Sequence, residues 1–473
     1  MNMKLILTLG VLAAGTCFAG TVRIAHFRSD ISPAVGENIC GYAPNQRSVE
    51  KHDPLFACGL LIEEGTNRAL LVALDLVGLD AEETRVVRVK CAAELGVRAD
   101  AVFLSCTHNH SGPECVRLID PPDAFNAKYV AFLEKTLVES VRMLKEAPRT
   151  ECEVMFNSVQ VDENYNRRFV TSDNVASFTP HRRVLIPGCD GPADKELGIV
   201  LFYPVARDPK AVPGYDAPCY VIGNYAAHAL ASHAPGIGGL RITADFPGFY
   251  RDYLKREMGC ESMFVQGASG DLVPKGDELG MEAARRTGVN LAMATINAAI
   301  DCERNPERYR LAEPRLATSM RTFALPMRKR FPALVQPEYQ GKDDMALDIQ
   351  CLSIGDVAFV GMPGELLCEL GLEIKWHSPY RRTWIANLST GIAGYFCSGN
   401  MLVQGGYEPK KQPFGFAGGL RIVTESVDAL GALRQQVFPE QVRDSEVYPD
   451  YLDEPLVRIP GGEKQLEFKR TKR

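Results

Sequence analysis

The chain has 473 residues, of which 46% are hydrophobic and 24% charged, a composition typical of a globular protein with a sizeable core. This composition excludes intrinsic disorder as the expected state of the chain. The net charge of −6 and the dispersed lysines and arginines exclude nucleic acid as an expected partner. The length is compatible with one large α/β domain.

The start of the chain has the pattern of a signal peptide. Lys4 supplies a positive charge, an apolar run follows, and small residues precede a cleavage site after Ala19, so residues 1–19 are predicted to be removed. A lipoprotein signal at Cys17 is disfavoured because Thr16 precedes it. No later stretch approaches the ~18 apolar residues of a membrane span. We therefore expect an exported protein, periplasmic or secreted, that is soluble once mature.

Cysteine usage adds few constraints. The sequence has 14 cysteines, and removing Cys17 with the signal peptide leaves thirteen, none of them in a CxxC pair. This disfavours a structural zinc finger or a thioredoxin-like redox pair. An odd number means that at least one thiol stays free or pairs between chains. The disulfide pattern and the oligomeric state do not follow from the sequence.

Two periodic segments in the first third of the chain are predicted to be helices. Asp80 and Glu83 form an N-cap and its capping-box partner, opening a helix that runs to about Gly96. Residues at three- and four-residue steps predict a second helix with one buried face. They are Tyr129, Phe132, Leu133, Leu137, Val141 and Leu144. Residues 277–300 predict a third helix, and residues 444–473 are predicted to form an extended tail after a domain at 20–443.

Five strand-like runs each lead into residues that can carry chemistry. They are Val102–Cys106 before His108 and His110, Tyr220–Tyr225 before His228, Met263–Gln266 before Gly267–Asp271, Val357–Val360 before Glu365, and Trp384–Leu388 before Tyr395. In open α/β sheets the ligand crevice lies beyond the carboxyl ends of the strands. We therefore predict an α/β fold of mixed, largely parallel sheets flanked by helices, with the catalytic site at the C-terminal ends of the strands.

Two imidazoles and a carboxylate at these strand ends suit zinc, with one position left open for water or substrate. His108 and His110 are two residues apart, so in an extended segment both side chains point to one side and only one reaches the ion. The other would serve as a base or proton donor. Bound zinc would lower the pKa of water to ~7 and polarise a carbonyl. Core histidines bonded to backbone are the alternative interpretation.

An ordered series of short motifs resembles that of the neutral ceramidases and their wider bacterial superfamily. The series runs Asp30-Ile31-Ser32-Pro33, Gly41-Tyr42, Thr107 to Pro113, His228, Ala244 to Gly248, Gly267 to Pro274, Met362 to Glu365, and Tyr395 with Tyr407. The resemblance covers about residues 23–433. It implies two groups of site residues: Zn²⁺ ligands at His108, His228, Glu365 and Tyr395, and residues that orient the substrate amide and share its protons at His110, Arg167 and Tyr407.

The resemblance also implies an activity: a zinc-activated water cleaves the amide bond of a small-molecule or lipid-like N-acyl substrate, with transient contact to a membrane surface left open. The sequence departs from the family pattern in three places. Val273 stands where the family has serine, Asn109 stands in place of a threonine, and the chain is too short for the C-terminal β-sandwich domain of full ceramidases. These departures weaken ceramide itself as the substrate.

Several alternatives stay open at this point. The same zinc site would serve an esterase or an N-deacetylase acting on a glycan or other exported metabolite, and a metal-free lipid or carbohydrate binder would need only the scaffold. Among the residues, His233 is a substitute for His228, and Arg168 is a rival of Arg167. Asp271, in a Gly-Asp turn, suits a structural role as well as a functional one.

Overall fold

A computed structural model provides the fold of the chain. It describes residues 20–41, 46–117, 125–170, 176–177, 191–206, 217–232, 240–275, 279–328, 339 and 341–439. The predicted signal peptide at 1–19 and the predicted tail at 444–473 lie outside the described residues, and so does His233.

The larger sheet has eight strands in the order β13-β11-β10-β6-β1-β3-β4-β5. Their bounds are β1 (Val22–Asp30), β3 (Phe56–Glu64), β4 (Asn67–Leu74), β5 (Val102–Cys106), β6 (Thr150–Gln160), β10 (Glu196–Pro204), β11 (Tyr220–Tyr225) and β13 (Glu261–Gln266). The pairs at the two edges, β4 with β5 and β11 with β13, are parallel. The strands between them pair antiparallel.

A second sheet has four strands in the order β15-β16-β17-β19. They are β15 (Leu316–Pro326), β16 (Asp344–Ile354), β17 (Val357–Gly361) and β19 (Arg382–Ala386). Only β17 and β19 pair parallel in this sheet. Short pairs complete the strands near the site: β7 (Asn164–Asn166) with β14 (Leu272–Pro274), and β18 (Glu365–Leu366) with β20 (Tyr395–Phe396).

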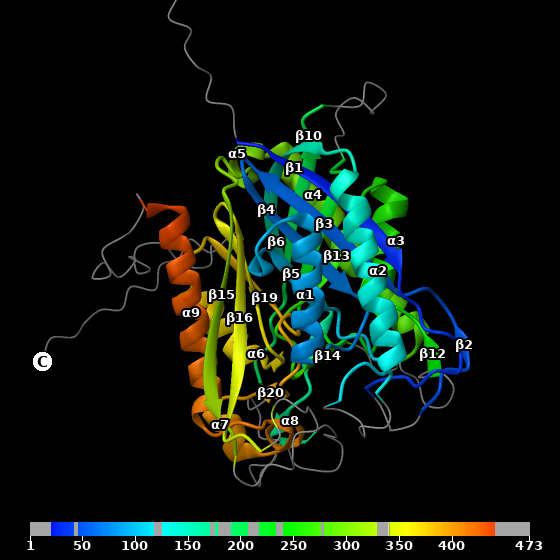
Figure 1. Cartoon of the computed structure of the whole chain (residues 1–473), viewed down its shortest axis with the longest axis vertical. Coiled ribbons are helices and arrows are strands. Elements are labelled where there is room, and N and C mark those ends of the chain that lie inside the picture. The colour runs from blue at the N-terminus through cyan, green and yellow to red at the C-terminus, as the bar shows by residue number, and fades with distance from the viewer. Residues whose placement is uncertain are drawn as a thin grey trace, which may run out of the picture.

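The two sheets and the helices form four layers (Figure 1). The helices are α1 (Ala81–Leu95), α2 (Ala127–Glu146), α3 (Asp245–Met258), α4 (Met281–Arg304), α5 (Pro306–Tyr309), α6 (Cys368–His377), α7 (Gly399–Gln404), α8 (Tyr407–Lys411) and α9 (Ala417–Val437). Residues of α1, α2, α3 and α4 pack on the outer face of the larger sheet, and those of α6 and α9 on the outer face of the smaller one.

Alternation along the strands divides the core between these layers. In β3 and β4, Leu61 and Leu70 face the helices α1 and α2, whereas Leu60 and Leu71 face the second sheet. There they join Trp384 of β19, which is fully buried. Because both faces of the larger sheet are covered, the buried parts of β3, β4, β5 and β10 are apolar at almost every position rather than at every second one.

The fold prediction of mixed sheets flanked by helices is confirmed, although five of the seven pairings in the larger sheet are antiparallel. The parallel pairs are the ones that matter for the site. The strands that the sequence singled out, β5, β11, β13, β17 and β19, all belong to parallel pairs. Their carboxyl ends therefore point the same way within each pair.

The first predicted helix is correct in extent and wrong in its cap. It ends at Leu95, followed by Gly96 in the left-handed conformation at φ 67°. The Asp80 side chain does not cap the helix; its carboxylate instead accepts hydrogen bonds from the backbone N and the Nη1 of Arg117. Burial, followed by the charge of Glu83, raises the pKa of Asp80 to about 7.

The other two predicted helices are found with small differences. In α2 the expected face is buried, except that Phe132 is 44% exposed. The helix expected at residues 277–300 begins later, at Met281, and continues to Arg304. Within the described residues, no helix combines the length and the apolar character needed to cross a membrane.

The larger sheet curls until its two edges meet. Asn109, just beyond β5 at one edge, forms an isolated parallel bridge with Ala229, beyond β11 near the other edge. The backbone N of His110 donates to the carbonyl of Ala229 over 3.1 Å. This closure joins strand ends that would lie at opposite sides of a flat sheet.

Candidate metal centre

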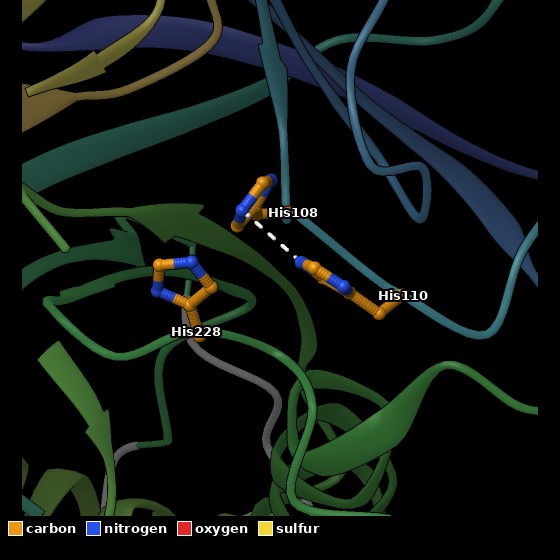
Figure 2. Close-up of side chains that lie close together, drawn as sticks. All are labelled: His108, His110 and His228. Atoms are coloured by element: carbon orange, nitrogen blue, oxygen red, sulfur yellow. Dashed lines mark hydrogen bonds between the residues drawn. The ribbon is translucent and has the colours of Figure 1, made fainter. Parts of the chain in front are cut away.

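Three histidines from the two edges of the sheet point at one another where the sheet closes (Figure 2). Their candidate ligand atoms, from His108, His110 and His228, all lie within 4.8 Å of one another. Glu365 from the short strand β18 completes the cluster: its Oε2 lies 3.2 Å from Nε2 of His108 and 3.3 Å from Nε2 of His228. The structure thus brings together the side chains that the strand ends predicted.

His108 is held in an unusual backbone conformation. Its φ of 59° is left-handed, so the segment is not extended there as the sequence analysis assumed. Outside glycine this conformation is uncommon and costs free energy, which the surrounding contacts must offset. The ring is buried, and its Nδ1 donates to the carbonyl of Val77 over 2.8 Å. With Nδ1 as the donor of a neutral ring, Nε2 is its acceptor, and this atom is directed into the cluster.

His228 is fixed in the same way. Its Nδ1 lies 2.9 Å from the carbonyl of Leu272, the first residue of β14, so Nε2 again faces the cluster. The backbone N of His228 donates to the same carbonyl over 3.0 Å. Burial, followed by the neighbouring charges of Arg167 and His108, lowers the pKa of His228 to about 4. This imidazole is therefore neutral at physiological pH.

His110 reaches the cluster from its rim. Its Nδ1 bonds to the carbonyl of Gly41 over 3.0 Å, and its Nε2 lies 3.2 Å from Nε2 of His108. Gly41 has φ 96°, and a Cβ there would stand 2.4 Å from Nδ1 of His110, so only glycine fits against this ring. Burial, followed by the imidazoles of His108 and His228, holds the pKa of His110 well below its ordinary value.

Glu365 and Tyr395 are neighbours because β18 pairs with β20 in parallel register, Glu365 opposite Tyr395. Glu365 therefore belongs to a strand and does not open the following helix, which begins at Cys368. The hydroxyl of Tyr395 hydrogen-bonds Glu365, and burial followed by this carboxylate keeps the pKa of the phenol well above its usual range.

The cluster suits a cation because its converging atoms are acceptors. With each Nδ1 bonded to a backbone carbonyl, the Nε2 atoms of His108 and His228 present lone pairs to a carboxylate. Oε2 of Glu365 is buried and receives no hydrogen bond from the described residues. Its separations of 3.2 and 3.3 Å from these nitrogens match the distance of about 3.3 Å between two ligands of a tetrahedral zinc ion. A divalent metal ion would satisfy all three atoms at once.

Arg167 lies against the metal centre and Arg168 does not. Nη1 of Arg167 is 3.3 Å from Nε2 of His228, and Nη2 donates to the hydroxyl of Tyr395 over 3.3 Å. Arg168 is buried and turned away, bonding to the carbonyl of Gly405 over 2.9 Å. The geometry therefore favours Arg167 over its neighbour as the arginine of the site.

Glu408 is a residue of this site that the sequence reasoning missed. It is fully buried, and its two carboxylate oxygens accept from Arg167 over 3.0 Å and from Arg168 over 2.6 Å. The side chain thus holds Arg167 in place beside His228. The signal in the sequence was its position directly after Tyr407, although nothing there indicated burial.

Tyr407 lies at the edge of the centre. It is the first residue of α8, its side chain is 42% exposed, and its ring packs edge-on against Tyr395 with centroids 5.7 Å apart. The guanidinium of Arg167 lies 5.8 Å from the ring centroid. Tyr407 is therefore the predicted site residue nearest to solvent.

Two other positions have structural roles. Asp271 is buried and accepts from the side chain of Asn166 over 2.7 Å and from the backbone N of Cys368 over 2.8 Å, which ties three elements together. Burial raises its pKa to about 6. Val273, in place of the family's serine, lies in β14 opposite Tyr165 and contributes packing.

A curled mixed sheet stacked on a second sheet, with a buried histidine and carboxylate cluster at the strand ends, defines an α/β protein with a candidate metal centre. The chain is similar in structure to neutral ceramidase from Pseudomonas aeruginosa, with a TM-score of 0.71 and 17% identity over 91% of this chain and 77% of that one. A structure of a ceramidase complexed with C2 gives a TM-score of 0.70 with the same identity and coverage. The chain therefore has a neutral ceramidase-like fold, as the motifs predicted.

Comparison of the sequence with models of known protein families gives no match, and comparison with curated proteins gives none either. At 17% identity, the likeness to solved structures concerns the fold.

Proposed function

We propose that this protein is an exported, zinc-dependent amidohydrolase that cleaves the N-acyl bond of a lipid-like substrate. One observation carries the proposal: Nε2 of His108 and Nε2 of His228, whose rings each hold a backbone carbonyl through Nδ1, both lie within 3.3 Å of the buried Oε2 of Glu365. The ceramidase-like fold supports the substrate class, since the structures similar to this chain are ceramidases, one of them complexed with C2.

His108, His228 and Glu365 are the residues that would hold the ion, with the hydroxyl of Tyr395 as a further oxygen ligand. A bound zinc ion supplies a Lewis acid for the substrate carbonyl and lowers the pKa of water to ~7. The chain prepares the ligands for this chemistry by fixing the tautomer of each imidazole through a backbone carbonyl.

His110 is placed to move the proton. Its Nδ1 is committed to the carbonyl of Gly41, so Nε2 is the atom that takes a proton from the attacking water and returns it to the leaving amine. The ring reaches the cluster at its rim, where a substrate would approach.

His110 also stands near enough to act as a ligand, because its Nε2 is 3.2 Å from Nε2 of His108. The variant His110→Ala separates the two roles. As a proton carrier, His110 is dispensable for the metal, so the variant should keep its zinc and lose turnover. Loss of zinc together with turnover would assign His110 to the ligands instead.

Arg167 and Tyr407 are the donors available to the oxygen that gains charge during amide cleavage. Removing one such donor typically costs ~3 kcal/mol of barrier, or about a hundredfold in rate. Arg167 is already oriented by Glu408 and by its bond to the carbonyl of Gly270 over 2.9 Å, so little reorganisation is needed when a substrate binds.

The test is a substrate panel with purified protein before and after metal removal. We expect stoichiometric zinc, release of fatty acid from an N-acyl sphingoid base, and loss of that activity with a chelator, restored by added zinc. Release of acetate from an acetylated sugar, or cleavage of an ester alone, would show that the proposed substrate class is wrong and that the proposed metal centre is right. Protein without stoichiometric metal, and with no response to chelation, would contradict the enzyme proposal as a whole.

A further inference from the structure

Two cysteines at the end of the sheet opposite the metal centre lie close together. Sγ of Cys152, near the start of β6, is 3.6 Å from Sγ of Cys219, which directly precedes β11. The strand β10 separates β6 from β11 and ends at Pro204, opposite Cys152 in the register. The two thiols therefore meet where the intervening strand stops.

The two thiols differ in exposure. Cys152 is fully buried, whereas Cys219 is partly accessible to solvent. Disulfide exchange needs an accessible sulfur for the first attack and a second thiol poised behind it. The pair has this arrangement, with Cys219 outside and Cys152 inside.

The thiols also differ in acidity. The hydrogen bond from Cys152 lowers the pKa of Cys219, and the same bond followed by burial raises that of Cys152. Other buried cysteines in the described part of the chain, among them Cys106, Cys260 and Cys351, have their pKa raised to about 12 by burial. Since the thiolate is the nucleophile, Cys219 is the reactive one.

We propose that Cys219 and Cys152 are a nucleophilic and a resolving thiol that together form a disulfide by exchange with a small-molecule disulfide. The Cys219 thiolate attacks one sulfur of the oxidant and releases the other half as a thiol. Cys152 then attacks Sγ of Cys219, gives up its proton and expels the second half. Two protein thiols are oxidised to one disulfide while the oxidant's disulfide is reduced to two thiols.

Closing this bond needs only a small movement. The sulfurs must approach by about 1.5 Å from their 3.6 Å separation, because a disulfide bond is about 2.05 Å long. The bond would enclose residues 152–219, the segment that carries Arg167. His228 lies nine residues beyond Cys219 (228 minus 219), roughly 30 Å away along an extended chain. We therefore expect the disulfide to raise thermal stability by about 5 °C without altering metal content.

The experiment incubates the full-length, metal-loaded protein with glutathione disulfide and follows intact mass and peptide maps. The mass of the wild type should fall by two hydrogen atoms, and the protein should carry no glutathione adduct. The peptide map should show the peptides of Cys152 and Cys219 joined by a disulfide. Cys152→Ser should instead keep one glutathione on Cys219. Cys219→Ser should form neither the disulfide nor a glutathione adduct. Cys260→Ala, a buried cysteine near the same end of the sheet, should behave as the wild type.

Three results would overturn the proposal: a stable glutathione adduct on Cys219 of the wild type, a disulfide mapped to other cysteines, or no reaction of the native protein under conditions that oxidise the unfolded chain. The wild-type mass decides the question even if a variant folds poorly. The outcome is independent of the enzyme activity, since neither thiol contacts the metal centre.

Discussion

The buried cluster around Asp75 and the one around Glu365 differ in how their charges are balanced. Asp75 accepts from both terminal nitrogens of Arg251, over 2.9 and 2.5 Å, and from the backbone N of Phe56 over 2.8 Å. Glu365 faces two imidazole nitrogens that present lone pairs. In the first cluster both carboxylate oxygens of Asp75 have donors, although Nε of Arg251 has no partner among the described residues. In the second, a cation would be the partner of Oε2 of Glu365.

The difference shows how to separate structural from functional polar groups in an interior. Both carboxylates are buried, so burial alone does not distinguish them. What distinguishes them is whether donors and acceptors match, because an unmatched buried acceptor is costly and persists only where something else compensates it.

The largest effect is expected from His108→Ala, which removes one member of the unmatched cluster. The variant should lose its zinc, and turnover should fall by at least ~10⁴-fold, or ~5 kcal/mol of barrier, because the ion is no longer held. Metal analysis and kinetics on the same preparation measure both.

The control for this variant is His377→Ala. His377 is an exposed histidine whose Nδ1 bonds to the carbonyl of Glu373 in its own helix. It should keep metal and rate, and both variants should keep the wild-type circular dichroism spectrum. A folded His108→Ala protein with full metal content would remove the basis for the metal centre.

Arg251→Met, in the cluster around Asp75, should lower the stability of the protein rather than its metal content. The free energy of unfolding should drop by about 3–5 kcal/mol, because the buried carboxylate of Asp75 loses its partner, while the molecules that remain folded keep their metal. Denaturant unfolding monitored beside metal content checks this. Arg285→Met, in an exposed ion pair with Glu282, should leave stability unchanged. A loss of metal without a loss of stability would reverse the two assignments.

Glu408→Gln should loosen Arg167 without touching the ion. An amide oxygen cannot serve two guanidinium groups as the carboxylate does, so kcat should fall about tenfold while KM and zinc content change little. Glu425, another buried glutamate that pairs two arginines, Arg321 and Arg421, provides the matched control as Glu425→Gln. Equal effects of the two substitutions would show that Glu408 acts only through stability.

The smallest effect concerns pH. An imidazole with an ordinary pKa of about 6.5 would weaken metal binding about tenfold between pH 7 and 5.5, because protons compete for its Nε2. The pKa of His228 is lowered to about 4, so this residue stays neutral and its contribution should change less than twofold over that range. The ring signals of His228 in the metal-free protein, followed by NMR between pH 7 and 5.5, measure its protonation, and chelator competition on the wild type measures the metal affinity. Protonation of His228 within that range would contradict the lowered pKa.

Much of this centre was predictable because strand ends leave a clear trace in the sequence. The runs Val102–Cys106 and Tyr220–Tyr225 coincide with β5 and β11, and the residues that follow them meet as expected. The sequence pattern could not predict the backbone conformation of His108, because its left-handed φ depends on tertiary contacts such as the one to Val77. No local periodicity encodes that.

Residues that act through distant partners were the least predictable. Glu408 meets Arg167 across 241 residues of sequence, and Asp80 prefers Arg117 to the helix start that it was expected to cap. In both cases a tertiary ion pair decides the role of the carboxylate, and a single sequence carries no sign of its partner. The sequence predicted mixed, largely parallel sheets, and it did not indicate that the centre of the larger sheet is antiparallel.

The closure of the curled sheet also has a consequence for biosynthesis. His108 and Glu365 are separated by 257 positions (365 minus 108), and they come from opposite halves of the fold, the end of β5 and the β18–β20 pair. A nascent or truncated polypeptide would lack one of these side chains, so an ion held by all of them would bind late in maturation. Metal occupancy would then report that the whole domain has been assembled.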